Sequence, residues 1–154
     1  MAQTIIGEWR FEGEAVMSPD QPPCKTTGTE RVRALGDLWV VGEGCGKMSD
    51  GGGMADMLIT LGYDTQQKAF VGSWAGSMMT NMWVYRGALE TSGKVLTLDT
   101  QRPGMAADGK QARYRDVITI KSPDERELSS QVLQPDGTWK RFMTATYRRV
   151  KPAA

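Results

Sequence analysis

Three carboxylates, Glu30, Glu43 and Asp116, are the side chains of this sequence best placed for chemistry. Alternate residues of a strand share a face, and the residues two or four positions away from each carboxylate are mostly apolar. These neighbours are Gly28, Val32 and Ala34 for Glu30, Trp39, Val41 and Cys45 for Glu43, and Tyr114, Ile118 and Ile120 for Asp116. If these faces point inward, each carboxylate must be paired, hydrogen-bonded or protonated.

Two kinds of role follow for such carboxylates. A carboxyl group with a raised pKa could act as a general acid or base on a hydrophobic substrate. The same groups could instead be structural, with Arg113, Arg115, Arg141 and the hydroxyls of Tyr85 and Tyr114 as candidate partners. A strand register displaced by one residue would turn all three carboxylates to solvent.

The sequence contains no histidine. Its absence excludes Ser-His-Asp and Cys-His catalysis, zinc sites that use histidine, and haem held by a proximal histidine. Cys24 and Cys45 are too few for a zinc or iron–sulfur site made of cysteine alone. The glycine-rich run 42–48 lacks the spacing of a phosphate-binding loop and has Met48 where such a loop needs Ser or Thr. We therefore expect no metal and no cofactor.

Charge is almost balanced, with 19 Lys and Arg against 18 Asp and Glu. This balance predicts no binding to nucleic acid or to an anionic membrane surface. No apolar run approaches the ~20 residues that span a bilayer, and the first residues do not have the pattern of a signal peptide. We expect a cytoplasmic protein in which Cys24 and Cys45 are free thiols.

Turn signals recur about every ten residues, a spacing typical of an all-β sandwich or barrel. Between the turns, residues rich in Val, Ile, Thr, Trp and Tyr favour strands. The expected strands are 7–17, 26–35, 38–45, 56–63, 69–76, 82–89, 95–101, 111–121, 126–134 and 138–149. No segment keeps apolar residues at helical spacing for three turns, so almost no helix is expected.

Short links between successive strands require antiparallel neighbours. An up-and-down meander of about ten strands removes its exposed edges by closing into a barrel. The sequence therefore predicts a single domain, residues 1–154, with a lipocalin-like β-barrel fold. The longer links 18–25, 47–55 and 103–110 are expected at the barrel mouths.

The chain is rich in side chains that line adaptable apolar pockets, with 10 Met and 5 Trp. The simpler interpretation is that most of these side chains fill a solid core. If the barrel is open, the candidate pocket residues are Glu30, Trp39, Glu43, Trp74, Trp83, Tyr85, Tyr114, Asp116 and Met143.

Gly7-Glu8-Trp9, at the start of the first expected strand, resembles the Gly-x-Trp signature of lipocalin-like, or calycin, barrels. In those proteins the Trp closes the barrel base and an Arg from the last strand packs over it. The resemblance implies this role for Arg148 or Arg149.

Longer segments carry a second resemblance, which extends from about residue 7 to residue 149. They are Thr27-Gly28-Thr29-Glu30, Leu38-Trp39-Val40, Thr60-Leu61-Gly62-Tyr63-Asp64, Gly76-Ser77-Met78-Met79-Thr80, Trp83-Val84-Tyr85, Leu96-Thr97-Leu98, Ala112-Arg113-Tyr114-Arg115-Asp116-Val117 and Arg141-Phe142-Met143. These segments are similar to a bacterial family named domain of unknown function 1579. The family has a barrel-type fold and no assigned activity, so the resemblance implies a fold and no reaction.

Three functional hypotheses remain. The first is a barrel that binds a small, mostly apolar or amphipathic molecule. The second is a histidine-free enzyme in which Glu30, Glu43 or Asp116 acts as general acid or base on a hydrophobic substrate. The third is a filled barrel that serves as an interaction module and forms a homodimer. Strong burial of one acid beside a deep cavity would favour the second hypothesis, and a fully salt-bridged acid would count against it. A solid core with an exposed apolar face would favour the third.

Overall fold

A computed structural model describes residues 2–16, 20, 22–48, 53–103 and 110–151. Within these residues the chain forms a short 3₁₀ helix and ten strands. They are η1 (Ala2–Ile5), β1 (Gly7–Ala15), β2 (Cys24–Leu35), β3 (Trp39–Met48), β4 (Met54–Asp64), β5 (Ala69–Gly76), β6 (Trp83–Leu89), β7 (Val95–Pro103), β8 (Gln111–Ser122), β9 (Glu125–Leu133) and β10 (Trp139–Arg149). In the described part of the chain, no helix is long and apolar enough to cross a membrane.

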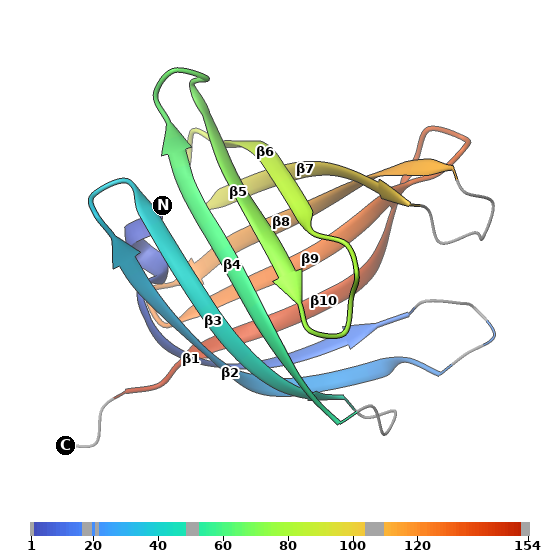
Figure 1. Ribbon diagram of the computed structural model, residues 1–154, viewed down its shortest axis with the longest axis horizontal. Helices are drawn as coiled ribbons and strands as arrows, with labels where there is room; N and C mark the ends of the chain where they lie inside the picture. The colour runs from blue at the N-terminus through green and yellow to red at the C-terminus, as the bar shows by residue number, and fades with distance from the viewer. Residues whose placement is uncertain (1, 17–19, 21, 49–52, 104–109, 152–154) are drawn as a thin grey trace.

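The strands form a closed barrel in which each strand pairs antiparallel with its neighbours in sequence (Figure 1). The first and last strands close it, because Trp9 of β1 lies opposite Glu30 of β2 on one side and Arg149 of β10 on the other. The predicted meander of about ten antiparallel strands, closed into a barrel and almost without helix, is confirmed.

Residues that face each other across a strand pair share a face of the sheet, so the register shows which side chains point inward. The inward face includes Trp9, which is 1% exposed. Trp9 lies opposite an even-numbered residue of β2, which lies opposite an even-numbered residue of β3, which lies opposite an odd-numbered residue of β4. The even residues of β2 and β3 and the odd residues of β4 therefore also face inward. The largest fully buried side chains are Trp9, Val40, Leu61, Leu96 and Leu98.

One end of the barrel is closed by η1, which is held in place by Trp9 and Arg149. The Trp9 indole Nε1 donates a hydrogen bond to the carbonyl of Ile5 at 2.8 Å. Arg149 donates to the carbonyls of Ile6 at 2.6 Å and Thr4 at 2.9 Å. Its guanidinium carbon lies 4.3 Å from the centre of the Trp9 ring. Arg149 thus has the position that the resemblance implied, whereas Arg148 is exposed.

The connections β1–β2, β3–β4, β5–β6, β7–β8 and β9–β10 lie at the opposite end, because successive strands alternate in direction (Figure 1). We call this the open end. The three longer links expected at a barrel mouth all connect strands here, but much of each link lies outside the described residues.

The inward face of β3 carries glycine in place of larger side chains. Gly42, Gly44 and Gly46 face inward, because Gly46 lies opposite Gly28 and Gly42 lies opposite Val32. A Cβ atom at Gly46 would lie 3.1 Å from the Phe11 ring. The Phe11 ring, which comes from β1 on the far side of β2, therefore occupies space that β3 leaves empty.

Candidate binding cavity

The interior contains a cavity of about 420 Å³ toward the open end of the barrel. Every described strand except β3 contributes lining residues, and most of these residues are apolar. They include Phe11, Ala55, Met57, Ile59, Trp74, Met78, Met79, Trp83, Leu98, Ile118, Leu128, Phe142, Met143 and Ala145. The cavity therefore lies within the barrel and continues the apolar core.

Four aromatic rings form a continuous wall of the cavity. Neighbouring ring centres lie 6.3 Å apart for Trp74 and Trp83, 5.4 Å for Trp83 and Tyr114, and 6.0 Å for Tyr114 and Phe142. Phe142 and Met143 both line the cavity although they are consecutive, and the register of β10 against β9 shifts between Arg141 and Met143. This β-bulge brings an additional large side chain into the interior.

Asp116 is the deepest carboxylate of the cavity, with 5% of the residue exposed. The hydroxyl of Tyr85 donates to one of its oxygens at 2.5 Å and the hydroxyl of Ser130 donates to the other at 2.6 Å. Burial raises the pKa of Asp116, although both hydrogen bonds and the charge of Arg102 act in the opposite direction. Burial, followed by the charge of Asp116, raises the pKa of Tyr85 well above its ordinary value.

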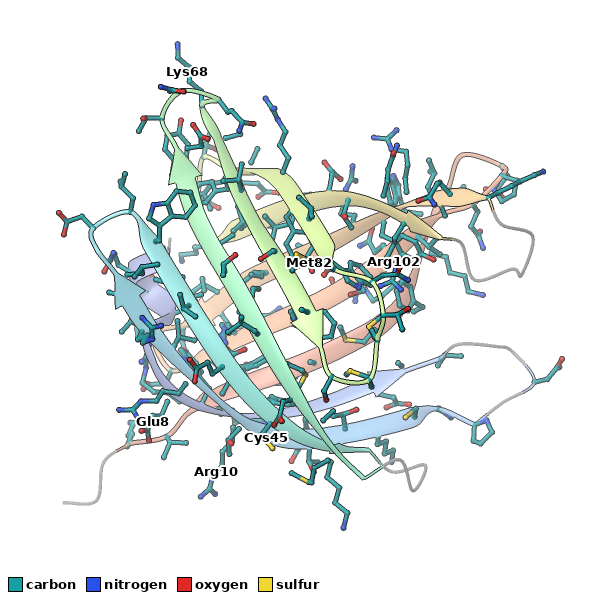
Figure 2. All side chains as sticks on the ribbon, in the orientation of Figure 1. Glu8, Arg10, Cys45, Lys68, Met82 and Arg102 are labelled. Atoms are coloured by element: carbon teal, nitrogen blue, oxygen red, sulfur yellow. The ribbon has the colours of Figure 1, made fainter. Side chains whose placement is uncertain are left out.

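Arg102 brings a positive charge to the cavity from the end of β7. Its guanidinium carbon lies 4.1 Å from the centre of the Trp83 ring and 5.7 Å from that of Tyr114. Burial lowers the pKa of Arg102, but an arginine side chain remains a cation at neutral pH. Arg102 lies toward the open end of the barrel, at the right of Figure 2.

A second inward-facing arginine, Arg126, lies at the closed end and forms an ion pair with Glu30. Its guanidinium carbon also lies 4.5 Å from the centre of the Trp9 ring and 4.2 Å from that of Tyr147. Glu30 therefore points inward, but it lies at the base of the barrel and, unlike the candidate pocket residue that the sequence suggested, does not line the cavity.

The structure brings six of the predicted pocket residues together around the cavity: Trp74, Trp83, Tyr85, Tyr114, Asp116 and Met143. The prediction was wrong for Trp39 and Glu43. Both are exposed, because the odd-numbered residues of β3 point outward while its glycines point inward. Cys45 points outward with them, and no disulfide joins Cys24 and Cys45, as expected.

The arginines that the sequence offered as partners are not in the interior. Arg113 and Arg141 are exposed, and Arg115 donates to Asp99 on the outer surface at 3.0 Å. Sequence reasoning missed Arg102 and Arg126. The sequence does contain a signal for both. Arg102 is an even number of positions from Leu96 and Leu98, and Arg126 is two positions from Leu128, so each arginine shares a strand face with apolar residues.

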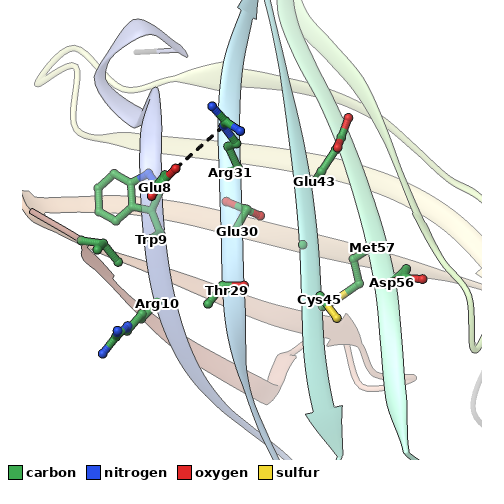
Figure 3. A pocket seen from close by; sticks show the side chains of 12 residues that line it. Glu8, Trp9, Arg10, Thr29, Glu30, Arg31, Glu43, Cys45, Asp56 and Met57 are labelled. Atoms are coloured by element: carbon green, nitrogen blue, oxygen red, sulfur yellow. Dashed lines mark ion pairs between the residues drawn. The ribbon is translucent and has the colours of Figure 1, made fainter. Parts of the chain in front are cut away.

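A second hollow, of about 660 Å³, lies mainly on the outside of β1–β4 (Figure 3). Exposed charged side chains of both signs line it, among them Glu8 and Arg31, which form an ion pair at 3.9 Å. Glu43 belongs to this outer groove. The apolar interior is the better site for a small molecule, because ligand pockets are mostly lined by apolar side chains.

Solved structures with the same fold share little sequence with this chain. Rv2717c from M. tuberculosis is 15% identical with a TM-score of 0.68, and the match covers 96% of this chain and 94% of that one. A redesigned β-barrel, mFAP1, bound to DFHBI, is 15% identical with a TM-score of 0.50 and coverages of 96% and 97%. EF1p2_mFAP2b bound to DFHBI is 14% identical with a TM-score of 0.51 and coverages of 97% and 96%.

These likenesses establish the fold alone. No curated protein matches the chain at a significant level. A family profile does match, and it covers residues 1–149, nearly the whole sequence. The chain therefore belongs to the family described as protein of unknown function (DUF1579).

Proposed function

We propose that this barrel binds a small, mostly apolar molecule in its interior. The observation that carries the proposal is the cavity of about 420 Å³ between apolar walls. Cavities of this kind, of ~300–1,000 Å³ with a few polar groups among apolar walls, are typical of small-molecule sites. Two structural neighbours are barrels bound to DFHBI, so this architecture can accommodate a ligand.

The walls of the cavity suit an apolar ligand and can adapt to its shape. Trp74, Trp83 and Phe142 offer flat aromatic surfaces, and Met78 and Met143 offer flexible, polarizable thioethers. Polar groups are few and are concentrated at Asp116 and Arg102. Such a distribution supports affinity from burial of apolar surface and orientation from one polar end.

The first experiment measures binding of a neutral apolar probe, N-phenyl-1-naphthylamine, by its gain in fluorescence in an apolar site. The wild type is compared with Ala145→Phe, which places a ring in the cavity, and with Ala88→Phe, which places the same ring on the exposed outer face of β6. We expect saturable binding to the wild type and to Ala88→Phe, and at least ~10-fold weaker binding to Ala145→Phe.

Circular dichroism of each variant shows whether the barrel has folded. Equal binding of the probe to folded Ala145→Phe and to the wild type would place the binding site outside the cavity and contradict the proposal. Mass spectrometry of an organic extract of the protein, purified under native conditions from its own host, then identifies the chemical class of any bound compound.

Asp116 supports a second candidate function, general acid or base catalysis on a hydrophobic substrate. Its carboxyl group lines the cavity, is 5% exposed and has a pKa raised by burial, which are the features of a tuned catalytic acid. The test incubates the compound recovered from the host with the wild type and with Asp116→Asn. Conversion by the wild type alone would support catalysis, and an unchanged compound in both samples would contradict it.

The third hypothesis, an interaction module with a filled barrel, does not account for the cavity. A homodimer of open barrels remains a separate prediction. Light scattering coupled to size-exclusion chromatography tests it, with a mass of about 34 kDa expected for a dimer of this 16.9 kDa chain.

A further inference from the structure

Arg102 is a cation at an apolar cavity, and two of its nitrogens have no hydrogen-bond partner among the described residues. Nε and Nη1 are both shielded from solvent. No described carboxylate forms an ion pair with Arg102, and its contacts are to the faces of Trp83 and Tyr114. Buried donors without an acceptor cost free energy, so this arrangement is suited to an acceptor that arrives from outside.

Arg126 shows how the same barrel treats an inward arginine with a structural role. It pairs with Glu30 and stacks on Trp9 and Tyr147 at the closed end, away from the cavity. Arg102 has matching aromatic contacts and lacks the carboxylate. Nη1 of Arg126 also has no partner among the described residues, so the two sites differ in two respects. Arg126 has an ion pair with Glu30, whereas Arg102 has no described ion pair and lines the cavity.

Trp83 provides a second donor in the same place. The residue is 8% exposed, and its indole Nε1 has no acceptor among the described residues. The Arg102 guanidinium carbon lies 4.1 Å from the centre of this indole ring, so the unpaired donors of the two side chains belong to one part of the cavity wall. Buried Trp N–H groups usually have a partner, and here a ligand oxygen would supply it.

Resting on the proposed function, we propose that the ligand is an amphipathic carboxylate whose carboxylate group binds Arg102 and Trp83 and whose apolar body fills the cavity. A guanidinium matches the planar carboxylate in shape and charge. The aromatic wall of Trp74, Tyr114 and Phe142 accepts the apolar body.

Neither of the two carboxylates that line the cavity, Asp116 and Glu14, forms an ion pair with Arg102. Asp116 takes its hydrogen bonds from Tyr85 and Ser130, and Glu14 is an exposed residue of β1. A bound carboxylate would therefore meet a cation whose charge no described ion pair neutralises. An amine of the same shape would face that cation directly, so the site discriminates by the sign of the charge.

Competition among ligands of one shape tests the proposal. Decanoate, decanol and decylamine each displace N-phenyl-1-naphthylamine from the wild type at neutral pH, and the ratio of the decanol to the decanoate dissociation constant is the readout. We expect a ratio of about ten or more, because a charge-assisted hydrogen bond contributes ~1.5 kcal/mol or more. Decylamine is expected to bind more weakly than decanol.

Variants then assign the preference to Arg102. Arg102→Met is expected to bring the ratio close to one. Arg113→Met removes an exposed arginine from the neighbouring strand and is expected to keep the wild-type ratio. Arg102→Lys, which keeps a cation, is expected to give an intermediate ratio that a purely steric role would not produce, and it serves as the test if circular dichroism shows Arg102→Met to be unfolded.

Each outcome separates the two proposals. Binding of the probe with equal affinities for decanoate and decanol would overturn the carboxylate proposal and leave the apolar site standing. A preference that persists in folded Arg102→Met or Arg102→Lys at its full wild-type value would also overturn it. Absence of binding by the probe and by all three competitors would overturn both.

Discussion

Arg126 donates a hydrogen bond to Glu30 across the closed end of the barrel and so joins two residues 96 positions apart in sequence. Only 6% of the Arg126 side chain and 13% of the Glu30 side chain are exposed. The pair connects β9 to β2, which are not neighbours in the barrel. Because both charges are buried, each depends on the other for compensation.

Replacing one member of this pair is therefore expected to destabilise the fold strongly. We predict that Glu30→Gln lowers the free energy of unfolding by ~3–5 kcal/mol, because it leaves the Arg126 charge buried without a partner. The measurement is urea unfolding followed by circular dichroism. The surface pair of Arg148 and Glu125, with side chains 62% and 41% exposed, provides the control, and Glu125→Gln is expected to cost less than ~1 kcal/mol.

The double variant Glu30→Leu with Arg126→Met shows whether Glu30→Gln is destabilising because the attraction within the pair is lost or because the Arg126 charge is left without a partner. It removes both charges and retains apolar volume, so most of the stability lost in Glu30→Gln is expected to return. Equal costs for Glu30→Gln and Glu125→Gln would show that the pair is not buried in solution.

Arg149 holds the closed end by its shape as well as by its charge. It donates to the carbonyls of Thr4, Ile6 and Pro123 and stacks on Trp9. Lysine cannot reproduce this planar fork of donors.

We therefore predict that Arg149→Lys lowers the free energy of unfolding by ~1–3 kcal/mol through lost hydrogen bonds. Arg148→Lys at the exposed neighbouring position is expected to change it by less than ~0.5 kcal/mol. Thermal unfolding of the two variants gives the comparison, and indistinguishable midpoints would mean that charge alone matters at position 149.

The strands were predictable because the turns were. Turn residues such as Asp64 and Gly93 recur at regular intervals, and between them the alternation of β1 is clear, with Trp9 and Phe11 inward and Glu8 and Arg10 outward. Most strand boundaries lie within two residues of the prediction, since a closed meander with short connections leaves few alternatives.

The candidate site was less predictable, and β3 shows why. Its outward face carries Trp39, Glu43 and Cys45, while Gly44 and Gly46 face inward. Hydropathy assigns an apolar face to the core, but here the inward face has almost no side chains because the Phe11 ring fills the space. Phe11 belongs to β1, which does not pair with β3, so the information needed to orient β3 is not local.

Gly28 of β2 offers a direct test of this close packing. A Cβ atom at Gly28 would lie 2.2 Å from the carbonyl oxygen of Cys45 and 2.7 Å from the Cα atom of Gly46. Backbone atoms cannot move aside cheaply, so Gly28→Ala is expected to cost ~1–3 kcal/mol of unfolding free energy.

Gly44→Ala is the matched control, because its nearest neighbour, the carbonyl oxygen of Thr29, is 3.5 Å away. Here the loss of flexibility in the unfolded chain favours alanine, and we expect no destabilisation and up to ~1 kcal/mol of gain. Chemical unfolding of both variants measures the difference. Similar stabilities would contradict the packing of Gly28 against β3.

Asp116 predicts a specific dependence of stability on pH. Burial raises its pKa in the folded state above the value of about 3.9 in the unfolded chain. The folded state therefore binds this proton more tightly. The stability contributed by protonated Asp116 is fully present below the unfolded pKa and is lost as pH rises through the folded pKa. Tyr85 does not interfere near neutral pH, since its own pKa is raised well above its ordinary value.

We predict that the free energy of unfolding of Asp116→Asn, relative to the wild type, increases as pH rises above ~4 and levels off once Asp116 is ionised in both states. Urea unfolding at intervals of pH measures this difference. Asp64 provides a control of opposite sign, because the backbone N–H of Gln67 lowers its pKa. Its stabilising contribution is lost as pH falls, so the difference for Asp64→Asn must change in the other direction. Parallel curves for the two variants would mean that Asp116 is not desolvated in the folded protein.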